Sequence, residues 1–320
     1  MPRAVRFSEY GDVDVLRVEE VPMPDPGPGE VLVRVRAAGI NPGEAAVRRG
    51  LLHERWPATF PSGQGSDLAG LVVASGPGVT GFRTDDEVLG WTDARASHAD
   101  YVVTGARQLV PRPVGVPWPA AGGLFVAGST AWAAVHAVGA GRGDTVVVAG
   151  AAGGVGSLAV QLARNAGATV IGLAGPHHHE WLSARGVVPV AYGEGMAEAI
   201  VAAADGARPD AFIDTFGADY VRLALRLGVE PQRINTIINQ RDAVEFGTRT
   251  AGNAEGADPE VLAELAALID RGALEVPISA TYPLTEVRAA FRELERRHTL
   301  GKIVLVPGGP EPSAVVSAGR

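Results

Sequence analysis

The feature that most restricts the fold of this chain is an apolar strand followed at once by a glycine-rich turn and an apolar helix. Residues 145–149, TVVVA, form an uninterrupted apolar run of the kind found in buried parallel strands. In the turn GAAGGVG that follows, Ala151, Gly153 and Gly156 fill an A/G-x-G-x-x-G frame. Because the chain has 42 glycines, this frame alone carries little information, and the strand and helix beside it give the frame its meaning.

Apolar residues after the turn recur at helical spacing, and Gly167 supplies a C-terminal stop. The residues on this helical face are Val155, Leu158, Ala159, Leu162, Ala163 and Ala166. Glycines on a strand-to-helix turn allow a pyrophosphate to meet free backbone N–H groups and the positive end of the helix. The sequence therefore predicts a dinucleotide-binding site. The alternative is a tight turn that binds no ligand.

The next strand bears on which dinucleotide binds. In an NAD site, an acidic residue about 20 residues further on accepts hydrogen bonds from the adenosine ribose. Here the strand is followed by Ala174, Gly175 and Pro176, with no carboxylate before Glu180. Small residues leave room for a 2′-phosphate, no carboxylate repels it, and His177 can donate to it. The sequence therefore favours NADP(H) over NAD(H), with histidine where arginine or lysine is usual.

The three consecutive histidines at 177–179 have two other interpretations. Consecutive side chains diverge on a strand or helix, so the run is poorly suited to holding one metal ion. The chain has no cysteine, which excludes disulfides, thiolate nucleophiles and cysteine-ligated zinc. We therefore predict no metal site. An ordinary polar loop remains the alternative to a phosphate contact.

The rest of the chain has two patterns of secondary structure. The first third predicts short strands typical of a small β-barrel, at 3–7, 15–21, 30–40, 68–76, 86–91 and 98–104. Residues 119–260 instead alternate strands with helices, which indicates a doubly wound parallel sheet. Its strands are expected at 145–149, 169–173, 187–190, 211–214 and 234–238. A length of 320 residues also favours two domains over one.

The C-terminal part predicts two helices and a final strand. Asp258 is a candidate N-cap for a helix that ends before Gly272. Apolar residues at helical spacing predict a second helix from about Val287, and KIVLVP then reads as a strand. We expect residues 308–320 to form a flexible tail.

Composition limits the partners and location of the protein. The formal net charge is −8, which argues against general attraction to nucleic acid or anionic membranes. The N-terminus lacks the charged start and apolar run of a signal peptide, and no window reaches 18 uninterrupted apolar residues. We expect a cytoplasmic protein with a small-molecule substrate and no membrane segment.

Several segments together resemble the zinc-free quinone oxidoreductases of the medium-chain dehydrogenase/reductase superfamily. They include GEVLVRVRAAGINPGE, GSTAWAAV, AGAAGGVGSLAVQLAR, FIDTFG and HTLGKIVLVP, and the resemblance covers residues 1 to about 307. It implies a discontinuous GroES-like β-barrel domain, from 1–118 and 261–307, beside a Rossmann domain at 119–260. Cofactor and substrate would occupy the cleft between these domains, and two copies would form a homodimer.

The resemblance also implies roles for individual residues. It puts Asn41 beside the nicotinamide and substrate, and Thr130 on the nicotinamide side. It puts four residues at the pyrophosphate, Ala152, Gly153, Gly154 and Val155, and two at the 2′-phosphate, His177 and Tyr192. Gly175 joins the cofactor-binding residues as one of the small residues that leave room for this phosphate. The residues themselves leave alternatives open: Asn41 can form the turn before a proline, and Thr130 can cap a helix.

The resemblance also bears on the reaction. Zinc-dependent relatives carry GHE where this chain has GSD, at 65–67. Without a Lewis acid to stabilise an alkoxide, reduction of a quinone or an activated C=C bond is favoured over alcohol oxidation. Ala45 and Ala46 occupy positions where relatives often carry aromatic or basic side chains. Glu44 can supply the proton if burial raises its pKa; the alternative is a solvated surface carboxylate.

Two other functions share these motifs. One is a stand-alone enoyl-thioester reductase of a biosynthetic pathway. The other is a nucleotide-binding or RNA-binding protein without turnover, which the acidic balance disfavours.

Overall fold

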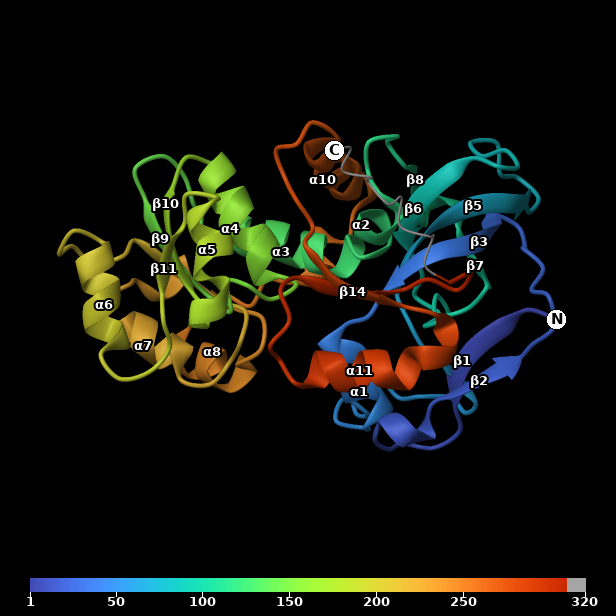
Figure 1. The fold of residues 1–320 in the computed structure, drawn as a ribbon, viewed down its shortest axis with the longest axis horizontal. Helices are drawn as coiled ribbons and strands as arrows, with labels where there is room; N and C mark the ends of the chain where they lie inside the picture. Colours follow the sequence, from blue (N-terminus) through green and yellow to red (C-terminus); the bar gives the residue numbers. More distant parts are fainter. Residues whose placement is uncertain (310–320) are drawn as a thin grey trace, which may run out of the picture.

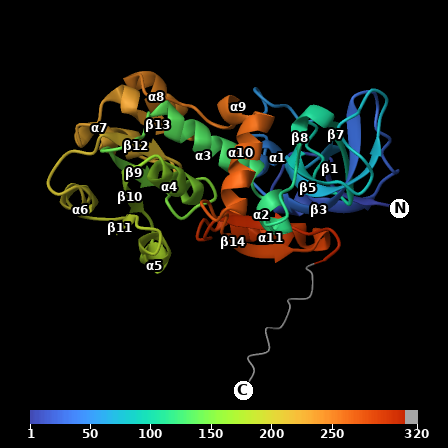
Figure 2. The ribbon, with the colours of Figure 1, turned by 90° about the horizontal axis from the view of Figure 1, so that it is seen from above.

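The computed structural model describes residues 1–309, which form two lobes lying side by side (Figure 1). One lobe holds a parallel sheet surrounded by helices, and the other holds antiparallel strands from both ends of the chain. Seen from above, α10 (Pro259–Asp270) lies where the two lobes meet (Figure 2). This arrangement confirms the predicted α/β class.

The parallel sheet has the strand order β11-β10-β9-β12-β13. Its strands are β9 (Thr145–Ala149), β10 (Thr169–Leu173), β11 (Val188–Val190), β12 (Ala211–Asp214) and β13 (Ile234–Thr236). Because β10 and β12 flank β9 on opposite sides, the order of strand addition reverses at β9. The carboxyl end of such a switch point is where open α/β sheets bind ligands.

Strand β9 is apolar throughout because both of its faces are covered. Val146 and Val148 pack into the cluster formed with α3 (Phe125–Ala137), α4 (Gly156–Asn165) and α10. Val147 and Ala149 pack into a separate cluster with α6 (Met196–Ala203) and α7 (Tyr220–Arg226). The uninterrupted apolar run therefore has the physical cause that the sequence predicted.

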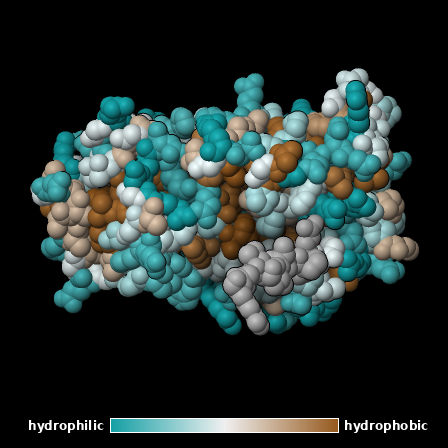
Figure 3. Space-filling view, turned by 45° about the horizontal axis from the view of Figure 1, so that its top comes forward, coloured by the Kyte–Doolittle hydropathy of each residue, from teal (hydrophilic) through white to brown (hydrophobic). Residues whose placement is uncertain are grey.

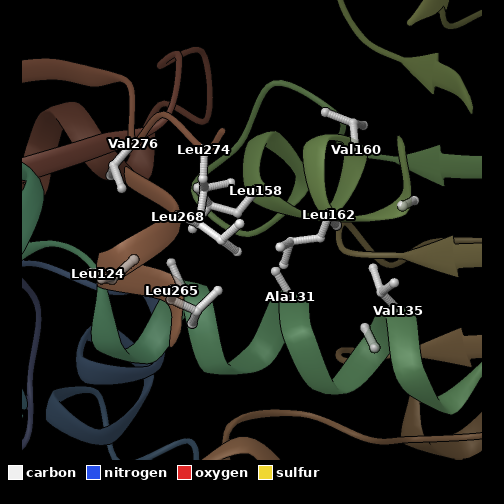
Figure 4. Close-up of a cluster of buried hydrophobic side chains, with 14 of the residues drawn as sticks. Leu124, Ala131, Val135, Leu158, Val160, Leu162, Leu265, Leu268, Leu274 and Val276 are labelled. Carbon is white, nitrogen blue, oxygen red and sulfur yellow. The ribbon is translucent and has the colours of Figure 1, made fainter. Parts of the chain in front are cut away.

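The helices beside β9 pack against one another through apolar side chains, many of them leucines. Figure 4 shows Leu158 and Leu162 of α4 close to Leu268 of α10 and Ala131 of α3. Gly167 ends this helical segment with a φ of +94°, as expected for a C-terminal glycine. The remaining helices of this lobe are α5 (His179–Ser183), α8 (Gln240–Phe246) and α9 (Asn253–Gly256).

The other lobe contains two mainly antiparallel sheets. The first has the order β2-β1-β4, with β1 (Arg3–Phe7), β2 (Arg17–Glu20) and β4 (Ser62–Gly63). The second has the order β14-β15-β3-β5-β6-β8, and β7 also pairs with β3. Its strands are β3 (Glu30–Gly39), β5 (Asp67–Ser75), β6 (Glu87–Trp91), β7 (Tyr101–Gly105), β8 (Leu109–Pro111), β14 (Ile278–Tyr282) and β15 (Lys302–Leu305).

The C-terminal strand returns to the lobe of antiparallel strands. β15 pairs antiparallel with the end of β3, through Val304 opposite Gly39. Helix α11 (Val287–Glu295) packs beside β15 and near α1 (Pro42–Arg48), while α2 (Trp118–Gly122) packs against β3. The strand pairing and packing therefore bring the two ends of the chain into one lobe.

The domain boundaries predicted from the sequence, after residues 118 and 260, remain a proposal. The division at 118/119 falls at the start of α2, and the division at 260/261 falls within α10. α10 packs against α3 of the parallel-sheet lobe and also against β8 of the other lobe. The predicted tail at 308–320 lies mostly outside the described residues.

Several strand ends differ slightly from the sequence prediction. β13 stops at Thr236 because its hydroxyl accepts hydrogen bonds from the N–H groups of Ile238 and Asn239, which turns the chain. β7 begins at Tyr101 rather than at His98.

Apolar surface gathers near the middle of the face shown in Figure 3, while polar surface covers much of both ends. Within residues 1–309, no helix is long and apolar enough to cross a membrane.

Candidate functional site

The glycine turn after β9 has the geometry of a dinucleotide loop. Gly150 has a φ of +73°, which favours glycine, and α4 passes very close above it. A Cβ on Gly156 would lie 2.0 Å from the Gly150 carbonyl oxygen, so only glycine fits there. Val155 and Gly156 stand at the helix start, where backbone N–H groups have no acceptor within the helix. The turn therefore fits the pyrophosphate of a dinucleotide.

The C-terminal segment of the other lobe borders this turn. The Gly301 N–H donates to the Ala152 carbonyl oxygen at 2.8 Å, and Gly301 forms a bridge with Gly153. A Cβ on Gly154 would lie 3.1 Å from Cδ of Lys302. The turn predicted to hold the pyrophosphate thus lies at the junction of the two lobes.

A buried ion pair lies next to this junction. The Lys302 ammonium donates to the Ile40 carbonyl oxygen at 3.1 Å and to Asn41 Oδ1, and lies 3.4 Å from Asp67 Oδ2. The side chains of Lys302 and Asp67 are 4% and 0% exposed. Asp67 Oδ1 also accepts from the Val126 N–H at 2.7 Å, in the first turn of α3. The carboxylate therefore joins strand β5, helix α3 and the C-terminal strand.

Asn41 is the N-cap of α1, and its amide is occupied within the protein. Its Nδ2 donates to Glu44 Oε1 at 3.3 Å and to Asp67 Oδ2 at 3.2 Å, while its Oδ1 accepts from Lys302. Its backbone N–H donates to Glu44 Oε2 at 3.0 Å, which completes a capping box. The turn-forming role considered for Asn41 is thus present, and contact with a nicotinamide stays a proposal.

Glu44 is not the solvated surface carboxylate that the sequence left open. Its side chain is 10% exposed, and its Oε1 also accepts from the Ser66 N–H at 3.1 Å. Burial raises the pKa of Glu44 to about 7, and the nearby negative charge of Asp67 adds to the shift. Lys302 and hydrogen bonds from Asn41 act in the opposite direction. A carboxyl group of this kind is partly protonated at neutral pH.

His98 lies behind Glu44 in the interior. Its Nε2 is 3.0 Å from the Gly39 carbonyl oxygen and 3.7 Å from Glu44 Oε2. Because a carbonyl only accepts, Nε2 carries the proton in the neutral ring. Nδ1 has no hydrogen-bond partner among residues 1–309, and burial lowers the pKa of His98 to about 4. The ring is therefore neutral at physiological pH.

Thr130 lies in the middle of α3, so the alternative that it caps a helix is wrong. Its hydroxyl donates to the Val126 carbonyl oxygen one turn earlier, and the residue is 5% exposed. Val126 is also the residue whose N–H binds Asp67. Thr130 is thus placed one helical turn beyond the buried ion pair.

The predicted 2′-phosphate residues lie after β10 and β11. His177 stands on a short 3-10 helix, η3 (Pro176–His178), and a Cβ on Gly175 would lie 2.7 Å from its Cε1. The space left by Gly175 is therefore filled by the imidazole of His177. The Tyr192 hydroxyl donates to the Leu173 carbonyl oxygen at 2.9 Å.

The second lobe reaches the same region through residues that the sequence analysis missed. The His178 ring lies beside the backbone of His298. The Arg297 guanidinium lies 5.6 Å from the centre of the Phe216 ring, which in turn lies 6.0 Å from the ring of Tyr192. An arginine of the second lobe thus packs on the aromatic ring that neighbours Tyr192.

The sequence contained a weak signal for one missed residue and none for the others. Lys302 is a lone charge at the start of an apolar strand, which indicates a buried partner without identifying it. His298 begins the segment HTLGKIVLVP that carries the family resemblance, but its place in the site was not inferred from it, and no pattern in the sequence marks His98 or Arg297. Within residues 1–309, no group of three or more His, Cys, Asp or Glu side chains is arranged to hold a metal ion.

Comparison with protein families agrees with this geometry. The family model described as zinc-binding dehydrogenase matches residues 98–305, and that of the alcohol dehydrogenase GroES-like domain matches residues 27–137. The chain belongs to the quinone oxidoreductase family of the medium-chain dehydrogenases/reductases. The predicted family and the combination of Rossmann and GroES-like folds are both confirmed.

Individual relatives of this medium-chain dehydrogenase/reductase extend the comparison. A quinone oxidoreductase of Pseudomonas aeruginosa is 29% identical, with 96% of this chain matching 100% of that protein. The structure of the quinone oxidoreductase from Coxiella burnetii has a TM-score of 0.85 and 28% identity, covering 95% of this chain and 99% of that one. The pikromycin polyketide synthase component PikAII of Streptomyces venezuelae is 30% identical over 96% of this chain, which spans only 8% of that protein. The chain is an oxidoreductase of a nicotinamide-cofactor family with a small-molecule substrate.

Proposed function

We propose that this oxidoreductase transfers hydride from NADPH to a quinone or an α,β-unsaturated carbonyl compound, without zinc. The observation that carries the proposal is the position of the Gly150–Gly156 turn beside Lys302. Lys302 in turn contacts Asn41 and Asp67, and Asn41 contacts the buried Glu44. Relatives named quinone oxidoreductase support the choice of acceptor.

In this proposal the parallel-sheet lobe binds the cofactor. The N–H groups at the start of α4, with Ala152, Gly153, Gly154 and Val155 around them, would hold the pyrophosphate. Thr130 would lie on the nicotinamide side, with its backbone fixed by α3. The bound cofactor supplies the hydride. A conjugated acceptor needs no metal because it delocalises the charge that remains after hydride transfer.

Glu44 is the proposed proton donor. A carboxyl group with a pKa of about 7 retains a proton in part of the population at neutral pH and can give it to the reduced acceptor. Asn41 would position Glu44, because its N–H and Nδ2 each bind one carboxylate oxygen. Hydride and this proton together complete a two-electron reduction, and solvent then reprotonates Glu44.

The adenosine end supports NADPH rather than NADH. No carboxylate follows β10 before Glu180, while His177 and Tyr192 lie on the two successive loops and Arg297 approaches from the other lobe. Cationic or donor side chains at this end suit a 2′-phosphate, and an acidic side chain would repel it.

The first test is a fluorescence titration of the purified protein with NADPH and NADH, followed by turnover assays with a panel of quinones and enones. Tighter binding of NADPH and oxidation of NADPH by at least one acceptor are expected. Equal affinities would refute the cofactor preference. NADPH binding with no oxidation by any acceptor in the panel would refute the proposed reaction.

A second candidate is an enoyl-thioester reductase, favoured by the match to a segment of the PikAII polyketide synthase component. The two candidates differ in substrate, because a thioester carbonyl activates the C=C bond in one and a ketone or quinone does so in the other. Comparing kcat/KM for a crotonyl thioester with that for a matched enone separates them. The predicted homodimer and cytoplasmic location also remain proposals, and light scattering of the purified protein tests the first.

A further inference from the structure

The proposed 2′-phosphate region is unusual in being lined by histidines. His177 and His178 follow β10 on η3, and their ring centres are 3.9 Å apart. The ring of His178 also lies beside the backbone of His298, in the other lobe. Two imidazoles and the backbone of a third histidine from the other lobe therefore lie close together, where a fixed cation would be the usual choice for binding phosphate.

We propose that His177, His178 and His298 make the preference for NADPH over NADH depend on pH, so that it strengthens as the pH falls from 8.5 to 6.5. The inference rests on the proposed function, since it concerns the same cofactor site. It assigns to these three residues a control of cofactor selection that an arginine or lysine pocket would lack.

The reason lies in the chemistry of the two partners. Histidine ordinarily titrates near pH 6.5, and a phosphate monoester takes its second charge near pH 6. Between about pH 6.5 and 8.5 the phosphate is mostly a dianion, while free imidazoles go from about half protonated to almost wholly neutral. A bound dianion favours the protonated imidazole, so binding of NADPH takes up protons and tightens on acidification. NADH has no 2′-phosphate, so its binding lacks this contribution.

The groups around the histidines decide the size of the effect. On the same segment, His179 is engaged through Nε2 with the Ala174 carbonyl oxygen at 3.1 Å, and Glu180 adds one negative charge. Tyr192 approaches from the loop after β11, and Arg297 approaches from the other lobe. Arg297 keeps its charge throughout this range, so a residual preference for NADPH should remain at pH 8.5.

His178 illustrates why a bound phosphate should change the protonation of these histidines. Its burial, and then the proximity of His177, lower the pKa of His178 in the protein without cofactor. A dianion beside the two rings would oppose the repulsion between His177 and His178. Both rings could then be protonated together, which couples proton uptake to the phosphate and not to the rest of the cofactor.

The experiment measures the dissociation constants of NADPH and NADH by fluorescence at pH 6.5, 7.5 and 8.5, at constant ionic strength. The ratio of the NADH constant to the NADPH constant should be about tenfold larger at pH 6.5 than at pH 8.5, which corresponds to an average uptake of about half a proton. Calorimetric titration in two buffers of different ionisation enthalpy should show proton uptake with NADPH and much less with NADH.

Variants test whether the histidines are responsible. His177→Arg should give a ratio that is high and much less dependent on pH, because one fixed charge replaces a titrating one. The double change His177→Gln and His178→Gln should give a low ratio with little slope. The matched control is His136→Gln: this histidine is exposed near the end of α3, where its Nδ1 meets the Trp132 carbonyl oxygen, and its loss should leave the slope unchanged.

The outcomes separate this inference from the proposed function. A preference for NADPH that is the same at all three pH values would overturn the inference and leave the proposed cofactor standing. A pH-dependent ratio that persists in a triple variant, with His298→Gln added to the double glutamine change, would also overturn it, since other groups would then be titrating. Equal affinities for the two cofactors at every pH would refute the proposed cofactor itself.

Discussion

Replacing Lys302 with methionine tests the buried cluster most directly. Methionine keeps an unbranched side chain of similar length but removes the ammonium group. Asp67, which is 0% exposed, would then retain hydrogen bonds from Asn41 and Val126 and lose its counter-charge. Removing one partner of a buried ion pair typically costs about 3–5 kcal/mol, because the other charge remains in the interior. We expect Lys302→Met to lower the free energy of unfolding by this amount.

Equilibrium unfolding in urea, followed by tryptophan fluorescence, measures the loss. The matched control is Arg292→Ala, which removes the ion pair between Arg292 and Asp14 on the surface, where the side chains are 54% and 74% exposed. Such exposed pairs contribute about 0–1 kcal/mol. Adding Asp67→Asn to the Lys302→Met variant should recover part of the loss, because the unpaired charge is then gone.

The reasoning fails if Lys302→Met is no more destabilising than Arg292→Ala. It also fails if the effects of Lys302→Met and Asp67→Asn simply add in the double variant, because residues that interact in one dry site should show a coupling energy. Either result would mean that the ammonium and the carboxylate do not depend on each other in solution.

Three further predictions concern Glu44 and the glycine turn. Since its pKa is raised to about 7, Glu44 is protonated below that pH, so kcat should decline as pH rises above 7. In Glu44→Gln this decline should disappear, and kcat at pH 6 should be lower than that of the wild-type protein. In the folded protein the pKa of Glu44 lies above its unfolded value of about 4.3, so the stability contributed by protonated Glu44 is lost as pH rises. Urea unfolding should therefore show that the wild-type protein loses stability relative to Glu44→Gln between about pH 4.3 and 7. Gly156→Ala should abolish NADPH binding in the fluorescence titration and lower the melting temperature, because its Cβ would lie 2.0 Å from the Gly150 carbonyl oxygen; full binding would contradict the tight turn.

The sequence was sufficient where local patterns determine the structure. β9, β10 and β12 begin and end at the predicted residues, because apolar runs covered on both faces are bounded by polar or turn residues. Asn41 and Glu44 are three residues apart, so their capping box was within reach of local reasoning. The pairing of Lys302 with Asp67 was not, because 235 residues separate them and only the return of β15 to β3 brings them together.

The segment from 297 to 302 shows why the remaining part of the site depends on the tertiary fold. His298 meets the region predicted for the 2′-phosphate, Gly301 binds the glycine turn, and Lys302 holds Asn41 and Asp67. The three contacts are made by residues of one short segment of the chain, so their positions depend on one another. One short segment thus reaches the region predicted for the 2′-phosphate, the glycine turn and the buried cluster, and only the fold of the whole chain brings these three places together.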